Sequence, residues 1–358
     1  SYFSLLTIKK GVSMSDKMPA VVNYGADAGS VELREVPVPE IGEEDVLLEV
    51  RAVGICGSDV HQWQGSHSWP VNYPCVLGHE FSGVVARAGK RVRQFSEGDR
   101  VTSETAAVIN PDSPLTRRGE YHLDPSRRGF GYGVDGAMAP FVRVPERCLH
   151  HVPSTIPFEI AALTEPCCVA YNAVCAHGRI EPGDDVVVLG PGPIGILCGV
   201  MAQISGAGRV VVVGLESDTE RFEVARKMGL ETAFAHDVQD IARTMGEGLG
   251  ADMVVDAAGV SPTLKLAIEI VRPGGRIAKV GWGKKPLDFS IDPIVQKAVT
   301  IQGSFSHNWP IWERVLRLFG TGRLNVEPLI NRVAPLRDWQ ECFTRMHECV
   351  YVKAVLTP

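Results

Sequence analysis

Residues 186–195 read VVVLGPGPIG, and this stretch decides the fold. A short β-branched run is followed by three glycines in a G-x-G-x-x-G spacing. Gly190 permits a tight turn, Gly192 lets the backbone approach a pyrophosphate, and Gly195 lets the next helix pack on the strand. The stretch therefore predicts a dinucleotide-binding turn, with a purely structural turn as the alternative. The residues expected to contact the dinucleotide are Gly190, Gly192, Pro193, Ile194 and Gly195.

An acidic residue about 20 positions further on is expected to accept hydrogen bonds from a ribose. Glu216 lies 21 residues beyond Gly195, just after the next β-branched run. The alternative is that Glu216 only favours the N-terminus of the following helix. No arginine follows Glu216 directly to neutralise a 2′-phosphate, so NAD is preferred over NADP. Arg221 is expected on the adenosine side, or else is a solvated charge on a helix.

The segment after residue 160 alternates between strand-like and helix-like runs, which predicts a doubly wound parallel sheet of the Rossmann type. The first half consists of short runs separated by Gly and Pro, which favours an antiparallel β-rich unit. The predicted strands are Met18–Val22, Val46–Ala52, Phe81–Ala86, Asp185–Leu189, Val210–Val213, Met253–Val255 and Ile277–Val280, and the predicted helices are Ile194–Ser205 and Asp218–Met228.

Two short motifs in the first half indicate a metal site. Residues 54–61 read GICGSDVH and residues 78–80 read GHE, so Cys56 and His79 lie 23 positions apart and Glu80 follows the histidine. Thiolate, imidazole and carboxylate donors favour zinc, and a catalytic zinc keeps one position open. Taken singly, Cys56 reads as a small buried apolar residue and His79 as a core imidazole. Taken together, the donors predict a zinc site.

A further donor is expected from Glu165, an acid in the apolar stretch LTEP at 163–166. Burying a carboxylate without a partner is costly, so a metal, or a water on it, gives a physical reason for its position. A charge at a helix N-terminus is the alternative. Such a zinc acts as a Lewis acid on a substrate hydroxyl, while a nicotinamide takes the hydride. Ser58 and His61 are expected to carry the released proton to solvent, with a turn former and a surface imidazole as the alternatives.

The bulk properties narrow the class of protein. A chain of 358 residues with 45% apolar residues suggests two domains. A net charge of −6 argues against a nucleic-acid-binding surface, and no apolar run approaches the roughly 20 residues of a membrane span. Nine irregularly spaced cysteines do not suggest a disulfide framework, so a reducing, cytoplasmic location is expected. Residues 1–17 read as an unstructured leader rather than a signal peptide.

These motifs closely resemble the zinc-dependent medium-chain alcohol and polyol dehydrogenases, and among them the sorbitol dehydrogenase-like branch. The resemblance covers residues 18–358 and includes GDRV at 98–101 and VGW at 280–282. It implies a GroES-like catalytic domain at 18–160 completed by 305–358, a Rossmann domain at 161–304, and usually a homotetramer, or a dimer.

The resemblance also assigns residues to the site. It implies a metal set drawn from Cys56, His79, Glu80 and Glu165, with Glu165 also counted among the catalytic residues. The nicotinamide half is expected to be lined by Val280, Gly281, Ser304 and Phe305. Contacts to a polyol are expected from Gln62, Ser306 and His307.

The chain departs from the family pattern in two places. Four cysteines that hold a second, structural zinc in many relatives correspond to Asn110, Ser113, Thr116 and Asp124. These groups do not suit a tetrahedral structural zinc, so one zinc per chain is expected. Gln62 stands where sorbitol enzymes tend to have an aromatic residue, and Ser306 where an arginine is common, so a polyol pocket that differs from that of sorbitol enzymes is expected.

The sequence thus predicts an NAD-dependent zinc dehydrogenase that oxidises a secondary hydroxyl of a polyol to a ketose. A dehydrogenase of a vicinal diol or of threonine is the nearest alternative, although no carboxylate anchor for threonine is evident. A non-catalytic nucleotide-binding relative is a remote alternative. Such a protein has no need of the four metal donors, and this sequence has all four.

Overall fold

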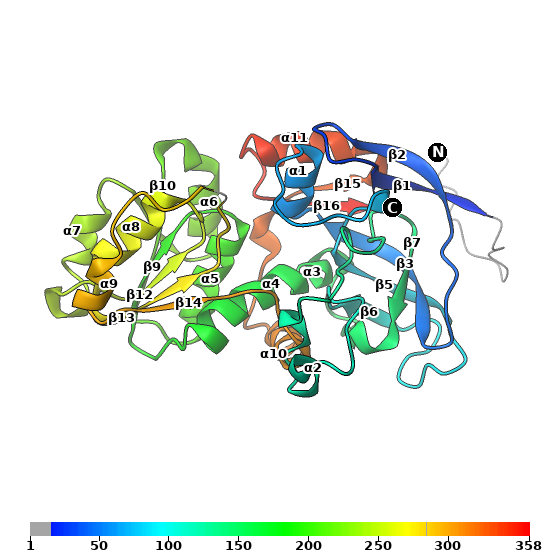
Figure 1. The fold of residues 1–358 in the computed structure, drawn as a ribbon, viewed down its shortest axis with the longest axis horizontal. Coiled ribbons are helices and arrows are strands. Elements are labelled where there is room, and N and C mark those ends of the chain that lie inside the picture. The colour runs from blue at the N-terminus through cyan, green and yellow to red at the C-terminus, as the bar shows by residue number, and fades with distance from the viewer. Residues whose placement is uncertain (1–15, 284) are drawn as a thin grey trace.

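The computed structural model describes residues 16–283 and 285–358. Most of the expected leader therefore lies outside the described residues. Lys17, its last residue, already begins strand β1 (Lys17–Asn23). Figure 1 shows two bodies side by side, one on each side of helices α4 and α10.

One body is built on a six-stranded parallel sheet of the predicted doubly wound type. The run VVVL that precedes the glycine loop forms β9, which is fully buried apart from its first residue, as a strand covered on both faces must be. Strand order reverses beside β9, which pairs with β10 on one side and β12 on the other. The strands in order are β11 (Glu231–Phe234), β10 (Arg209–Gly214), β9 (Asp185–Leu189), β12 (Ala251–Asp256), β13 (Val271–Lys279) and β14 (Thr300–Gly303).

Helices flank this sheet and place the glycine loop at its carboxyl edge. Helix α5 starts within the loop, directly after Gly192, and packs against β9 and β10. Ligands of doubly wound folds bind at the edge where the strand order reverses, so the loop is in the expected place. The helices are α5 (Pro193–Ile204), α6 (Thr219–Lys227), α7 (Val238–Ala242), α8 (Ser261–Ile270) and α9 (Asp292–Gln296).

The other body is β-rich, as predicted, and contains a seven-stranded and a three-stranded sheet. In the larger sheet the strands follow the order β15 (Ile330–Pro335), β16 (Lys353–Thr357), β3 (Asp45–Gly54), β5 (Glu80–Ala88), β6 (Arg100–Ser103) and β8 (Leu149–His151). The seventh strand, β7 (Phe141–Pro145), also pairs with β3. The smaller sheet orders β2 (Val31–Pro37), β1 and β4 (Cys75–Val76). Strands β15 and β16 are parallel, whereas the sequence predicted an antiparallel unit. Because β16 pairs with β3, residues far apart in the chain meet beside the predicted metal site.

Among the remaining helices, α4 and α10 lie between the two bodies, and α3 and α11 pack on the β-rich body (Figure 1). Helix α4 packs against both α5 and α10, and one apolar core includes Ala52 of β3 together with Val186 of β9. Glu165 lies in the first turn of α4 and is thereby held between the two sheets. These helices are α1 (Gly57–Trp63), α2 (Pro114–Arg117), α3 (Phe158–Ala162), α4 (Thr164–Tyr171), α10 (Trp309–Gly320) and α11 (Trp339–His347). A π-helical turn, η3 (Asn172–His177), continues α4.

The fold class expected from the sequence is therefore confirmed. The exact domain boundaries stay a prediction. Over the residues that the structure describes, every helix is too short or too polar to cross a membrane.

Candidate active site

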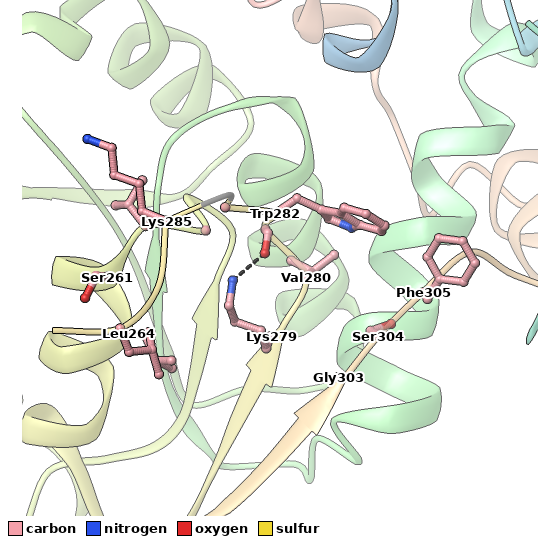
Figure 2. Close-up of a pocket in the computed structure, with 14 residues that line it drawn as sticks. Ser261, Leu264, Lys279, Val280, Trp282, Lys285, Gly303, Ser304 and Phe305 are labelled. Carbon is pink, nitrogen blue, oxygen red and sulfur yellow. Dashed lines mark hydrogen bonds between the residues drawn. The ribbon is translucent and has the colours of Figure 1, made fainter. Parts of the chain in front are cut away.

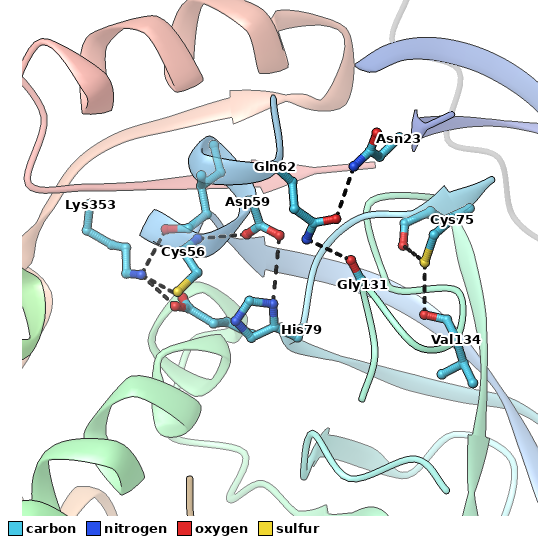
Figure 3. A network of polar contacts seen from close by, with 12 residues as sticks. Asn23, Cys56, Asp59, Gln62, Cys75, His79, Gly131, Val134 and Lys353 are labelled. Atoms are coloured by element: carbon cyan, nitrogen blue, oxygen red, sulfur yellow. Dashed lines mark hydrogen bonds and ion pairs between the residues drawn. The ribbon is translucent and has the colours of Figure 1, made fainter. Parts of the chain in front are cut away.

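The structure brings three of the four predicted metal ligands together. Cys56 precedes α1, and His79 and Glu80 lie where β5 begins. One donor atom from each of the three residues lies within 4.8 Å of the other two. A thiolate, an imidazole and a carboxylate in this arrangement fit the donor preferences of zinc. Figure 3 shows Cys56 and His79 facing the same point.

Glu80 also has a partner that was not predicted from the sequence. Lys353 of β16 donates to both Glu80 carboxylate oxygens at 2.7 Å and to the Ile55 carbonyl at 2.9 Å. Lys353 is only 2% exposed. Burial by itself lowers the pKa of Lys353, but the Glu80 carboxylate outweighs it and raises the pKa above its usual range. The lysine therefore stays protonated, and no short motif around residue 353 signals this role.

The backbone of β3 leaves room for this pair. A Cβ on Gly54 would lie 2.3 Å from Glu80 Oε2. Any larger residue at position 54 would displace the carboxylate, so this glycine is needed for close approach.

Asp59 is a second residue that the sequence interpretation did not single out. It is fully buried, and its Oδ2 accepts a 2.9 Å hydrogen bond from the Cys56 backbone N–H. Its Oδ1 lies 3.7 Å from His79 Nδ1, and neither of these two atoms has a hydrogen-bond partner. Burial lowers the pKa of His79, yet the negative charges of Asp59 and Cys56 hold it well above its usual range. This negative potential is what a divalent cation would neutralise, so the donor set fits a bound zinc.

Glu165, the fourth predicted ligand, lies outside the three-residue group. Its Oε1 accepts a 3.0 Å hydrogen bond from His307 Nε2, and Trp312 Nε1 donates to His307 Nδ1 at 2.7 Å. Because the indole can only donate, Nδ1 of His307 is an acceptor and Nε2 carries the proton. Burial alone raises the pKa of Glu165, and the hydrogen bond from His307 helps to hold it below its usual value. His307, expected to contact a polyol, is thus engaged with Glu165.

The two residues predicted to move a proton lie on α1, near Cys56. Ser58 is partly exposed and His61 is exposed, three residues along the same helix face. His61 Nδ1 lies 3.0 Å from Ser66 Oγ, a partner that was not predicted.

Gln62, expected to contact a polyol, is buried: its Oε1 accepts from Asn23 and its Nε2 donates to the Gly131 carbonyl. Its amide therefore connects the end of β1 to the loop that contains Gly131.

The glycine loop fits a dinucleotide. A Cβ on Gly195 would lie 1.9 Å from the Gly190 carbonyl oxygen, so Gly195 allows α5 to pack against the loop. A Cβ on Gly192 would meet nothing within 4 Å, which leaves open space where a pyrophosphate approaches. Glu216 is exposed just beyond β10. Arg221 forms a 3.1 Å ion pair with Asp218, so the structure ties this arginine to a neighbouring acid.

A cavity of about 370 Å³ lies at the ends of β13 and β14. Val280, Gly281, Ser304 and Phe305, the four residues expected around a nicotinamide, all line it (Figure 2). The Ser304 hydroxyl is buried without a hydrogen-bond partner, as expected for a group that awaits a ligand.

Trp282 also lines this cavity and connects it to the β-rich body. Its ring lies 5.9 Å from that of Phe305 and 6.2 Å from that of Trp69. Trp69 belongs to the segment that follows α1, so aromatic side chains from both bodies meet at the mouth of the cavity.

The loop that corresponds to the structural zinc lobe is held by a buried polar network. The Tyr121 hydroxyl donates to Glu104 at 2.6 Å and accepts from the Trp309 backbone N–H at 2.6 Å. His150 lies between Glu104 and Glu313, with contacts of 3.3 and 2.7 Å. Of the four positions that hold cysteine in many relatives, Ser113 caps α2 and Asp124 accepts from Ser126; the other two are Asn110 and Thr116.

Comparisons with known proteins agree with this geometry. The family model described as an alcohol dehydrogenase GroES-like domain matches residues 42–154, and the one described as a zinc-binding dehydrogenase matches residues 193–321. A sorbitol dehydrogenase of Halalkalibacterium halodurans is 34% identical over 95% of this chain and 99% of that protein. A D-arabitol-phosphate dehydrogenase of Enterococcus avium is 32% identical over 96% of this chain and 98% of that protein.

Solved structures give the same result. Galactitol-1-phosphate dehydrogenase from Escherichia coli superposes with a TM-score of 0.86 at 26% identity, covering 95% of this chain and 100% of that one. A match over 95% of this chain extends over both bodies. The chain belongs to the zinc-dependent medium-chain dehydrogenase family.

Proposed function

We propose that this protein is an NAD-dependent zinc dehydrogenase that oxidises a secondary hydroxyl of a polyol to a ketose. Two observations together carry the proposal. Cys56, His79 and Glu80 come together in the β-rich body, and the cavity in the other body is lined by the four residues expected around a nicotinamide. The names of the sorbitol and arabitol-phosphate relatives support the substrate class.

In this proposal Cys56, His79 and one of the two carboxylates, Glu80 or Glu165, hold one catalytic zinc. Zinc, when bound, supplies a Lewis acid for the substrate oxygen, and NAD, when bound, supplies the hydride acceptor. The chain itself orients these groups. Lys353 holds Glu80 in place, and the proton on His307 Nε2 keeps Glu165 an acceptor.

The remaining roles follow from position. The glycine loop cradles the pyrophosphate, Glu216 accepts from a ribose, and Ser58 passes the substrate proton to His61 and then to solvent. Arg221 forms an ion pair with Asp218, and in this proposal it acts on the adenosine side of the cofactor by holding Asp218 in place. We assign residues 18–160 and 305–358 to the catalytic domain and residues 161–304 to the cofactor domain.

We also propose a cytoplasmic homotetramer or dimer with one zinc per chain. All nine cysteines are free, which supports a reducing compartment. Every residue of the edge strand β14 is exposed, and Val295 nearby is 83% exposed, which supports pairing with a second copy. Light scattering of the purified protein measures the mass of the assembly and thereby tests the proposed tetramer or dimer.

Removal of the thiolate tests the metal assignment. In Cys56→Ser we expect zinc content to fall from about one per chain to a small fraction and polyol oxidation to disappear, while NAD still binds. Zinc by mass spectrometry, NADH formation and NAD binding by fluorescence are the three readouts. Retained turnover, or two firmly bound zinc ions in the unmodified protein, contradicts the assignment.

Replacement of the ribose acid tests the cofactor assignment. In Glu216→Ala we expect the KM for NAD to rise by roughly tenfold and the preference over NADP to shrink, because the acid no longer accepts from the ribose. Glu220→Ala, an exposed acid one turn further on, is the matched control. Unchanged kinetics with both cofactors in Glu216→Ala would place the ribose contact elsewhere.

A further inference from the structure

A cationic side chain lies at the rim of the cavity without a counter-charge. The Arg127 guanidinium carbon sits 4.7 Å from the centre of the Phe305 ring, and Phe305 lines the cavity. Within the described residues no carboxylate lies within 4.0 Å of the Arg127 side-chain nitrogens. Lys353, the buried cation at the zinc donors, does have such a partner. In a chain with a net charge of −6, this arginine is available to an anion from outside the protein.

Two buried nitrogen atoms at this point lack hydrogen-bond partners. Arg127 Nη1 and His122 Nδ1 are both buried with no hydrogen-bond partner. His122 is only 4% exposed, so its orphan atom is not a solvated surface group. Buried polar atoms are nearly always paired, so two orphans on neighbouring side chains indicate that a shared acceptor is missing.

The titratable groups that act on His122 are two imidazoles and the arginine, and no acid is among them. His122 interacts electrostatically with Arg127, His177 and His307. Burial, followed by the two other imidazoles and then the arginine, lowers the pKa of His122 to about 4, so it is neutral near pH 7. The nearby acid Asp124 is engaged with Ser126. A neutral imidazole beside a guanidinium offers hydrogen bonds and one positive charge.

The pair is also placed at a suitable position relative to the reacting groups. His307, which His122 faces, donates to Glu165 beside the zinc donors. A substrate whose hydroxyl lies at the zinc donors can therefore extend past His307 towards Arg127. The dinucleotide phosphates are expected elsewhere, at the Gly190–Gly195 loop and near Glu216, so they do not supply the missing acceptor.

We propose that Arg127 and His122 bind a terminal oxyanion of the substrate, so that the enzyme acts on a polyol that carries a phosphate monoester or a carboxylate. This proposal rests on the proposed dehydrogenase function. A guanidinium fork matches either oxyanion in a bidentate manner, and the third oxygen of a phosphate can accept from the imidazole.

The test compares matched substrates with the zinc-loaded enzyme and NAD. The pairs are arabitol with arabitol 5-phosphate, galactitol with galactitol 1-phosphate, and sorbitol with sorbitol 6-phosphate, and gluconate and threonine form the carboxylate arm. We expect at least one anionic compound to have a kcat/KM about tenfold or more above its neutral counterpart. The arm that is preferred distinguishes phosphate from carboxylate.

Variants assign the preference to the proposed residues. Arg127→Gln should lower kcat/KM for the anionic substrate by roughly 10- to 100-fold and leave the neutral polyol within about threefold, since a charge-assisted contact is lost. Arg127→Lys should retain part of the preference, and His122→Asn should lose a smaller part. Arg128→Gln, at the exposed neighbour, is the control and should match the unmodified enzyme.

The outcomes separate the two proposals. Oxidation of neutral polyols without any anion preference overturns the oxyanion site and leaves the dehydrogenase function standing. An equal loss on neutral and anionic substrates in Arg127→Gln also overturns it. If nothing is oxidised, the dehydrogenase function fails. Binding of arabitol 5-phosphate and gluconate by calorimetry then still decides the oxyanion site, because binding must occur and must weaken in Arg127→Gln.

Discussion

At the scale of single residues, no contact within the folded chain requires position 192 to be a glycine, so the reason lies in the ligand that approaches it. The φ of −69° and ψ of 175° at Gly192 are accessible to any residue, and a Cβ there would touch nothing. Gly195 differs, because a Cβ there would collide with the Gly190 carbonyl. The two glycines of one motif therefore serve ligand approach and packing separately.

An alanine at each of these two positions should therefore affect a different property, cofactor binding at position 192 and stability at position 195. Gly192→Ala should keep the melting temperature within about 2 °C and raise the Kd for NAD by roughly tenfold or more, because the methyl group occupies the path of the pyrophosphate. Gly195→Ala should lower the free energy of unfolding by about 1–3 kcal/mol through overpacking. Calorimetry and NAD fluorescence titration check both. A Gly192→Ala protein that binds NAD normally would show that the pyrophosphate does not pass this point.

At the scale of elements, the loop before β7 is held in place without cysteines. Tyr121, Glu104 and His150 connect the loop, the end of β6 and β8, and Glu313 ties them to α10. Helix α10 also carries Trp312, whose N–H fixes the protonation of His307. The network therefore joins the loop to the helix that orients a residue of the active site.

Removal of one hydroxyl should loosen this loop. Tyr121→Phe loses two hydrogen bonds, leaves Glu104 Oε2 unpaired in a buried position, and should lower the free energy of unfolding by about 1–3 kcal/mol. We expect faster proteolytic cleavage within residues 110–124 and unchanged zinc content. Tyr24→Phe, at an exposed tyrosine, is the control. If Tyr121→Phe resists protease as well as the control does, other contacts hold the loop.

Elements were predictable where the signal is local. Strand β9 matches the expected Asp185–Leu189, and α5 begins one residue before the expected start, because a β-branched run and glycines mark both. Strand β13 was expected at 277–280 but runs from Val271 to Lys279. Its first part contains Pro273, Gly274 and Gly275, which are typical of a turn, and they form an irregularity between the paired residues Val271 and Arg276. The strand therefore begins earlier than predicted because Val271 pairs with Ala251 ahead of this irregularity.

At the scale of the whole molecule, the site depends on contacts between distant parts of the chain. The motifs at 54–61 and 78–80 predicted Cys56, His79 and Glu80, because these donors are close in sequence. Lys353 lies 273 residues from Glu80, and its neighbours carry no motif. Its role follows only from the pairing of β16 with β3. The same holds for Trp312 and Arg127, which reach the site through tertiary packing.

The buried ion pair of Glu80 and Lys353 should show strong coupling. In the zinc-free protein, Lys353→Met should lower the free energy of unfolding by about 3–5 kcal/mol, because a buried carboxylate loses its counter-charge. Adding Glu80→Gln should restore much of this loss. Urea unfolding of the two single variants and the double variant measures the coupling, and Lys227→Met, at an exposed lysine, is the control. Additive effects would show that the pair does not interact energetically.

The distance between Glu80 and Lys353 along the chain also sets an order of events during biosynthesis. A ribosome that has just added Glu80 must add 273 more residues before Lys353 exists. At about 5–20 residues per second this takes roughly 15–55 s. Throughout that interval the nascent chain holds a thiol, an imidazole and an uncompensated acid in a half-formed sheet. Closure of the site by Lys353 is therefore a late step, and slow translation of the second half prolongs the period in which Glu80 has no counter-charge.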